Sequence, residues 1–200
     1  MKVLLIALLL GLRHASDPDH LAAVSTLIAS DPEDGTRQAG RLGLSWGAGH
    51  ALALALFGLP IVLLQAFLPD TAQRTAEAAV GVMIMLLAAR LLLRRRGGLG
   101  RSRLQAFGIG LVHGTGGSAG VSVLLLATIS DRAAAVAALI VLAAGTAISM
   151  AILSSGFGYA ITRGPVIPRM VAFAPAMGLA TLAFGGWYTL GAIGAVPYVL

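Results

Sequence analysis

The sequence predicts an all-α, polytopic membrane protein with about six transmembrane helices. Of its 200 residues, 58% are hydrophobic and only 11% are charged, whereas charged residues make up about a quarter of a soluble domain. The mean hydropathy is +0.89. Crossing the hydrocarbon core takes ~20 mostly apolar residues per helix. Six segments meet this requirement, and they cover residues 3–29, 42–68, 72–93, 104–128, 133–161 and 170–196.

The first segment begins with "MKVLLIALLL", which also resembles the start of a secretory signal. No small-residue cleavage site precedes the polar residues that follow, and a second apolar run, "LAAVSTLIA", completes a membrane-length segment. We therefore interpret residues 3–29 as the first transmembrane helix, with the signal peptide as the alternative.

Short polar stretches separate the six segments, and those quoted next carry proline, glycine or aspartate turn signals. They read "SDPEDGTRQAGR", "LPDTAQR", "RRRGGLGRSR" and "TRGPVIPR". Because these stretches leave no room for a linker, we expect a single transmembrane domain over residues 1–200.

The basic residues predict the orientation of the chain, since Lys and Arg accumulate on the cytoplasmic side. The connections after the first, third and fifth segments hold Arg37, Arg41, Arg94, Arg95, Arg96, Arg101, Arg103, Arg163 and Arg169, and the opposite side holds only Lys2, Arg74 and Arg132. We expect a multi-pass protein of the cell (inner) membrane with both termini on the non-cytoplasmic side.

The net charge of +6 does not indicate nucleic-acid binding. Six of the fourteen basic residues lie between Arg90 and Arg103, beside an apolar segment and without interleaved aromatic residues. This pattern favours contact with anionic lipid headgroups.

A weak internal repeat divides the chain into halves. "GLRH" at Gly11–His14 recurs as "GLVH" at Gly110–His113, 99 residues later. With three helices in each half, the second copy enters the membrane from the other side, as in the inverted repeats of many secondary transporters. We therefore predict two inverted three-helix repeats, with chance similarity between two glycine-rich helices as the alternative.

The histidines are confined to the predicted transmembrane segments, at His14, His20, His50 and His113. Ionisable residues are costly inside a membrane and usually mark a functional site. Hydrogen-bonded packing is the alternative for His50 or His113 taken alone. The absence of cysteine excludes thiolate ligands, and imidazole with carboxylate favours Ni, Co, Zn or Cu over Mg and Ca.

The stretch "HASDPDH" predicts a break in the first segment. His14 and His20 are six residues apart, so a regular helix would separate them by ~9 Å along its axis. Pro18 has no N–H to donate to the carbonyl of His14 and its ring crowds that carbonyl, so we expect the helix to open and bring both imidazoles to one ion. A plain turn between two short helices is the alternative. The five glycines of "GLVHGTGGSAG" predict a similar break in the fourth segment.

The candidate metal ligands are six residues, with Asp17 and Asp19 either binding directly or orienting the imidazoles. They are His14, Asp17, Asp19, His20, His50 and His113.

Five other polar or polarisable positions stand out in the segments. Arg13 is expected to pair with Asp17 or to point into a different cavity, and Glu77 and Arg90 are expected to snorkel from the ends of the third segment. Thr146 and Met150, one helical turn apart, offer an oxygen and a thioether, but packing is the favoured role.

These residues resemble a known family. "HASDPDHLAAV" resembles the His-x-x-x-x-Asp-His signature of the nickel/cobalt transporter family, with His14, Asp19 and His20 on the signature positions and Asp17 on the acidic position between them. "WGAGH" and "GLVHGTGGSAG" are similar to the family's further Gly-His elements. The resemblance implies that Ni²⁺ or Co²⁺ crosses the membrane. Family members are longer, with eight predicted helices, and this chain is similar from their second helix onward. The His-rich stretch of some related exporters is missing, which favours uptake.

The first functional hypothesis is therefore a secondary-type permease for Ni²⁺ or Co²⁺, with no enzymatic activity and no permanent cofactor. No phosphate-binding loop is present, so the energy would come from an ion gradient, the membrane potential or a partner. A homo-oligomer is compatible with the sequence. Two alternatives stay open: an intramembrane enzyme, either a metal-dependent hydrolase or an acyltransferase using the His14/Asp19 pair, and a membrane subunit that senses metal.

Overall fold

The computed structural model describes residues 2–29, 35–65, 69–93, 102–116, 118–162 and 166–197. Within these ranges all the regular secondary structure is helical, which confirms the all-α class. The elements are α1 (Lys2–His14), α2 (Pro18–Ala29), α3 (Gly35–Ala53), the π-helix η2 (Leu54–Gly58), α4 (Leu59–Leu64), α5 (Asp70–Leu92), α6 (Arg103–His113), α7 (Ser118–Ala127), α8 (Arg132–Thr162) and α9 (Val166–Ala192).

Three helical stretches of the described residues are long and apolar enough to cross a membrane: Thr36–Leu64, Asp70–Leu92 and Arg132–Ala160. They correspond to the second, third and fifth predicted segments. The helix α3 begins at Gly35 rather than at residue 42, so Arg37 and Arg41 lie in a helix and not in a connection. Arginine and glutamine support a helix as well as most apolar residues do, so hydropathy alone misses this start.

The first and fourth predicted segments are both broken, as expected. The helix α1 ends at His14 and α2 begins at Pro18, with the backbone N–H of Asp17 donating to the carbonyl of His14 at 3.1 Å. Pro18 takes the first position of α2, where its missing N–H leaves no helical bond unmade. The second break lies between the end of α6 at His113 and the start of α7 at Ser118.

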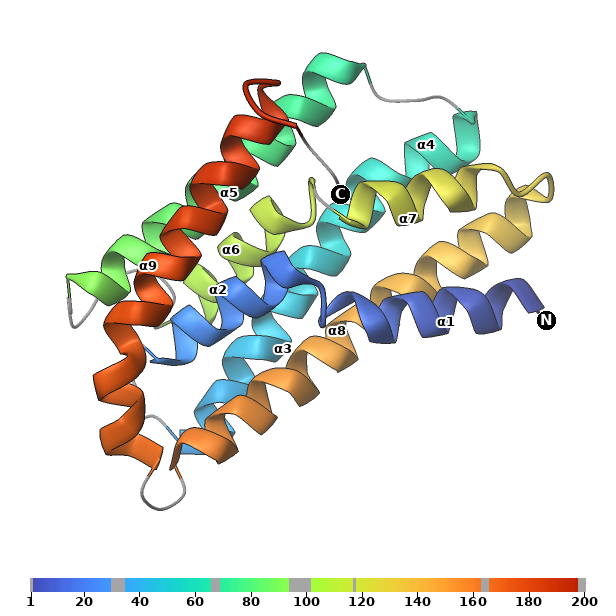
Figure 1. Cartoon of the computed structure of the whole chain (residues 1–200). Helices are drawn as coiled ribbons and strands as arrows, with labels where there is room; N and C mark the ends of the chain where they lie inside the picture. The colour runs from blue at the N-terminus through green and yellow to red at the C-terminus, as the bar shows by residue number, and fades with distance from the viewer. Residues whose placement is uncertain are drawn as a thin grey trace.

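The packing of the helices brings both breaks to the middle of the molecule (Figure 1). The helix α3 packs against α6 and α8, α1 packs against α8, and α5 packs against α9. The short helix α2 contacts both α5 and α9. The segments on either side of each break are therefore held by long helices.

Glycines allow close approach where α3 crosses its two neighbours. A Cβ built on Gly47 would lie 2.7 Å from Cα of Ala147 in α8, and one built on Gly49 would lie 2.9 Å from the carbonyl carbon of Phe107 in α6. Real Cβ atoms do not approach other atoms so closely, so α3 fits between α6 and α8 only with glycine at these positions.

Thr146 and Met150 of α8 have the packing role that was favoured for them. Both are fully buried. The Thr146 hydroxyl donates to the carbonyl of Leu142 at 2.9 Å, and Met150 belongs to the same apolar cluster as Trp46 and Ile109.

The π-helix η2 follows α3 directly and was not expected from the sequence. Pro60, the second residue of α4, has no N–H for the carbonyl of Leu56 four residues earlier. A π-helical turn is one way in which a helix accommodates such a missing bond. The backbone irregularity lies one turn beyond His50.

Candidate metal centre

The four histidines meet in one buried cluster although they come from four helices. His14 is the last residue of α1, His20 the third of α2, His50 lies in α3 and His113 ends α6. None is more than 4% exposed. The ring centroids of His20 and His113 are 4.1 Å apart, and those of His14 and His20 are 4.5 Å apart. The break at Pro18 thus brings together two imidazoles that a regular helix would hold apart.

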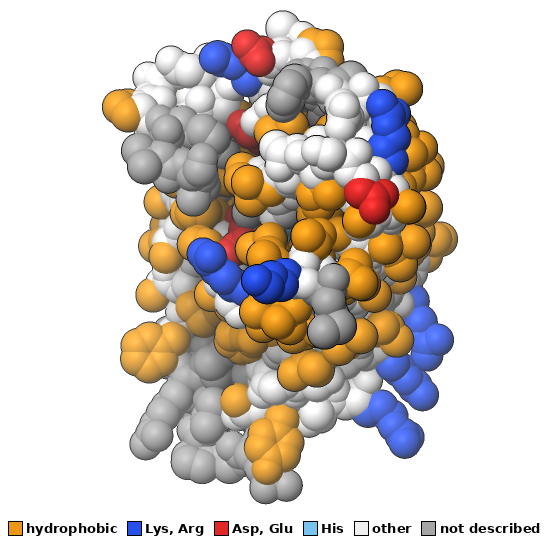
Figure 2. All heavy atoms as spheres, turned by 90° about the vertical axis from the view of Figure 1, so that its right-hand side faces the viewer, with side chains coloured by type: hydrophobic (Ala, Val, Ile, Leu, Met, Phe, Trp, Pro, Cys, Tyr) orange, Lys and Arg blue, Asp and Glu red, His pale blue; other side chains and the backbone are white. Residues whose placement is uncertain are grey.

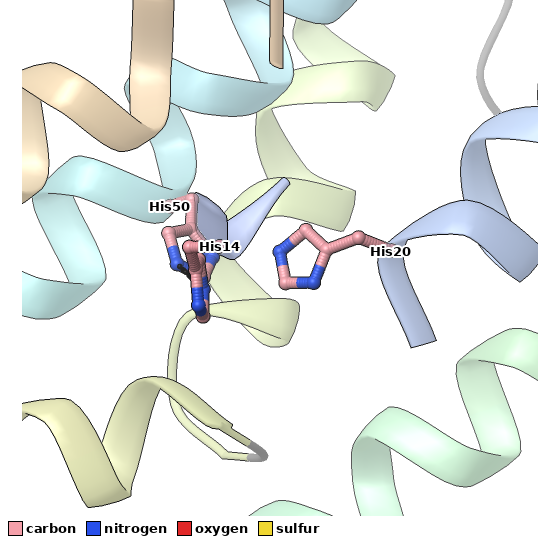
Figure 3. A group of neighbouring side chains, drawn as sticks. All are labelled: His14, His20 and His50. Carbon is pink, nitrogen blue, oxygen red and sulfur yellow. Dashed lines mark hydrogen bonds between the residues drawn. The ribbon is translucent and has the colours of Figure 1, made fainter. Parts of the chain in front are cut away.

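One group of three possible ligands consists of His14, His20 and His50 (Figure 3). One ring nitrogen from each residue lies within 4.8 Å of the others. The Nε2 atoms of His14 and His50 are 2.9 Å apart. Since metal–imidazole bonds are about 2.0–2.1 Å long, nitrogens around a tetrahedral ion are roughly 3.4 Å apart. The His14–His50 pair is therefore slightly closer than two ligands of one tetrahedral ion would be.

A second group consists of Asp19, His20 and His113, so His20 belongs to both. Asp19 Oδ2 is 3.1 Å from Nε2 of His113, and Asp19 Oδ1 is 3.2 Å from Nδ1 of His20. The backbone N–H of His20 also donates to Asp19 Oδ1 at 3.0 Å. Asp19 therefore holds two imidazoles from opposite halves of the chain.

Asp17 lies at the edge of the cluster. Its side chain is 17% exposed, and its Oδ2 is 3.3 Å from Nδ1 of His14. A carboxylate on one ring nitrogen fixes the imidazole so that the other nitrogen can bind metal. The geometry thus suits Asp17 to orienting His14, whereas Asp19 belongs to a group of possible ligands.

The free ring nitrogens fit the binding of a metal ion. Within the described part of the chain, Nε2 of His20, Nδ1 of His50 and Nδ1 of His113 are buried and have no hydrogen-bond partner. An unsatisfied buried polar atom costs about 1–3 kcal/mol. A bound cation is one partner that would satisfy the Nε2 of His20, which faces His14 and His50 in Figure 3.

Trp46 forms an apolar wall of the cluster, a role that the sequence reasoning missed. It is fully buried, and its indole stacks on the imidazole of His20 with ring centroids 6.0 Å apart and an interplanar angle of 7°. The available signal was its position four residues before His50, which puts both side chains on one face of α3.

A cavity of about 1000 Å³ lies beside the cluster, with His14, Asp17 and Asp19 in its wall. Arg13 lines this same cavity, so the expectation that it points into a different one is wrong. Glu77 lines it too. The expectation that Glu77 and Arg90 snorkel is also wrong, because they are only 7% and 9% exposed. The reason is that α5 is covered by α2, α6 and α9.

The chain is similar to the urease accessory protein UreH of Bacillus sp. (strain TB-90). The two are 26% identical over 181 residues, which cover 81% of this chain and 78% of that protein. No family model matches the chain, and no solved structure matches it significantly. The similarity to this urease accessory protein extends over most of both chains.

Proposed function

We propose that the protein is a permease that moves a divalent transition-metal ion, Ni²⁺ or Co²⁺, across the membrane. The observation that carries this proposal is the buried cluster of four imidazoles and the Asp19 carboxylate, assembled from α1, α2, α3 and α6. Imidazole-rich sites favour Ni, Co, Zn and Cu over Mg and Ca. The similarity to a urease accessory protein supports nickel or cobalt within this group, and we propose uptake as the direction.

Six crossings of the membrane are the arrangement that we infer. The helices α1, α2, α6 and α7 have 13, 12, 11 and 10 residues, and at 1.5 Å per residue each is shorter than the ~30 Å hydrocarbon core. We propose that α1 with α2, and α6 with α7, each make one crossing in two parts. Irregular backbone is tolerated at membrane depth where protein surrounds it. Buried Ala15 and Gly114 in the two breaks support this arrangement.

The contacts between helices support the inverted repeat. If α1, α3 and α5 correspond to α6, α8 and α9, then the contact of α1 with α8 corresponds to that of α6 with α3. Gly11 and Gly110, the first residues of the repeated motifs, each lie where one helix of this corresponding pair crosses the other. A Cβ on Gly11 would lie 2.5 Å from the carbonyl oxygen of Leu142 in α8, and one on Gly110 would lie 2.8 Å from the carbonyl carbon of Trp46 in α3.

We propose that transport proceeds by movement of the two halves about the cluster. His14, His20 and His50 belong to the first half and His113 to the second. A rotation of one half against the other therefore changes the distance between His113 and the Asp19–His20 pair, and with it the affinity for the ion. Such rocking of one repeat against the other around a central site is the usual form of alternating access.

The test is flux of radiolabelled Ni²⁺ and Co²⁺ into proteoliposomes containing the parent protein or single alanine variants. We expect the parent to transport and each of His14→Ala, His20→Ala, His50→Ala and His113→Ala to lose most of the flux. Flux that survives all four substitutions would contradict the proposed site. Tight metal binding without flux by the parent would favour a sensor, and turnover of an ester or acyl substrate without flux would favour an enzyme.

A further inference from the structure

The cavity beside the cluster extends to one end of the molecule. Its wall includes Asp70 at the start of α5, Ser122 in α7 and Val196 just beyond α9, in addition to the candidate ligands His14 and Asp19. Figure 2 shows one face of the protein on which acidic side chains lie deep between hydrophobic ones. The cavity thus joins the buried cluster to the end of the protein where α5 begins and α9 ends.

The charge of the cavity wall suits a cation. The wall contains four carboxylates and two guanidinium groups, so its formal charge is −2. The carboxylates belong to Asp17, Asp19, Asp70 and Glu77, and the guanidinium groups belong to Arg13 and Arg74. The other side of the cluster is apolar and closed, since Trp46 stacks on His20 and packs with buried Met150 and Ile109. A cation would therefore reach the imidazoles from the cavity side.

Glu77 is a carboxylate in this wall that belongs to neither group of possible metal ligands. It is 7% exposed, and its Oε1 accepts a hydrogen bond of 3.0 Å from the side-chain amide of Gln73, one turn earlier in α5. A buried carboxylate in a membrane-spanning helix is costly and usually functional. The turn after His113 also reaches this point, because a Cβ on Gly116 would lie 3.0 Å from the backbone nitrogen of Glu77.

We propose that the cavity is the entrance to the metal cluster and that Glu77 is its capture residue, binding the hydrated divalent cation before the ion loses water to the imidazoles. This inference rests on the proposed function. Gln73 positions the Glu77 carboxylate through its hydrogen bond. Asp17 contacts the ion after Glu77 and before His14, since Asp17 both lines the cavity and contacts the imidazole of His14. The resulting order of contacts is carboxylate first and imidazole second.

The first test is the concentration dependence of ⁶³Ni²⁺ flux in Glu77→Gln, which removes the charge but can still accept the hydrogen bond from Gln73. We expect the KM to rise about three- to tenfold through loss of local attraction, with the maximal flux and the equilibrium Kd of the cluster nearly unchanged. Glu77→Asp should recover part of the KM. The control is Asp131→Asn, which removes one carboxylate outside the cavity wall while keeping a good cap for α8.

The second test uses the absence of cysteine from the chain. In Ser122→Cys, a membrane-impermeant cationic thiol reagent should block flux when it is added to one face of the membrane and not to the other. Ser155→Cys, on α8 and outside the cavity wall, should give no block from that face.

An unchanged KM in Glu77→Gln, or flux through Ser122→Cys that the reagent does not reduce from either face, would overturn the inference while leaving the permease intact. A parent protein that neither binds nor transports the metal would instead overturn the proposed function itself. The two failures are therefore distinguishable in one set of vesicles.

Discussion

Gly110→Ala tests whether the crossing of α3 and α6 sets the geometry of the metal cluster. The added Cβ would overlap the carbonyl oxygen of Trp46 and would lie 2.6 Å from its Cδ1 and 2.8 Å from its carbonyl carbon, whereas ordinary contacts begin at 3.4 Å. The overlap involves backbone, so rotation of a side chain cannot relieve it. The two helices must separate by roughly 1 Å, which forfeits a quarter to a half of the dispersion energy at each contact affected.

Overpacking of this kind costs about 1–3 kcal/mol. For a protein of this length, each kcal/mol lowers Tm by about 2–4 °C, so we expect Tm to fall by about 2–12 °C. His113 lies three residues further along α6, and its Nε2 is now 3.1 Å from Asp19 Oδ2. A shift of this size takes the pair out of hydrogen-bond range, so we also expect ⁶³Ni²⁺ to bind at least about tenfold more weakly.

The assays are thermal unfolding of the purified protein in detergent and equilibrium binding of ⁶³Ni²⁺. The matched control is Gly108→Ala on the same helix, where an added Cβ meets no atom within 4 Å. Alanine is a better helix former than glycine by about 1 kcal/mol, so the control should be as stable as the parent or more so. Equal Tm and equal affinity for the two variants would refute the proposed packing of the crossing.

Three further outcomes follow from the cluster and the core. Asp19→Asn should weaken Ni²⁺ binding about 10- to 100-fold, since it removes the charge that holds two imidazoles. Asp17→Asn should weaken binding less. A larger loss of equilibrium binding in Asp17→Asn than in Asp19→Asn would contradict the assigned roles. Ligand histidines must be neutral to bind metal, so the affinity for Ni²⁺ should fall as the pH is lowered. The fall should be about tenfold per pH unit for each proton displaced. An affinity that is constant between pH 8 and 5 would exclude imidazole ligands. Met150→Ala, at a fully buried position, should lower the free energy of unfolding by about 2–5 kcal/mol. Thermal unfolding should show a lower Tm with little change in metal specificity. An unchanged Tm would show that Met150 is not packed as described.

The local features of the fold were predictable because they depend on neighbouring residues. Pro18 removes one specific backbone bond, and the break between α1 and α2 lies where that bond would have been. The glycines after His113 similarly mark the end of α6. Apolar length identified the second, third and fifth segments, although the polar first turns of α3 escaped a criterion based on hydropathy.

The partners within the cluster were not predictable, because they depend on packing between distant segments. Asp19 in α2 and His113 in α6 are 94 residues apart in the sequence, and only the tertiary packing of the chain brings them together. The different roles of the two aspartates have the same origin, since Asp17 and Asp19 are equally polar in sequence but point to different neighbours. The burial of Glu77 was not predictable either, because it depends on the packing of α2, α6 and α9 against α5.

The two helix breaks also have an electrostatic consequence. Both α1 and α6 end at a histidine of the cluster, and the C-terminal end of a helix carries the equivalent of about −0.5 elementary charge. The helices α2 and α7 begin on the other side of the two breaks, at Pro18 and Ser118, and their N-terminal ends carry the opposite partial charge. Unlike the carboxylates, these peptide dipoles do not titrate. Each break therefore offers the cluster both backbone carbonyls and backbone N–H groups whose contribution is the same at every pH, whereas the carboxylates and imidazoles take up protons under acidic conditions.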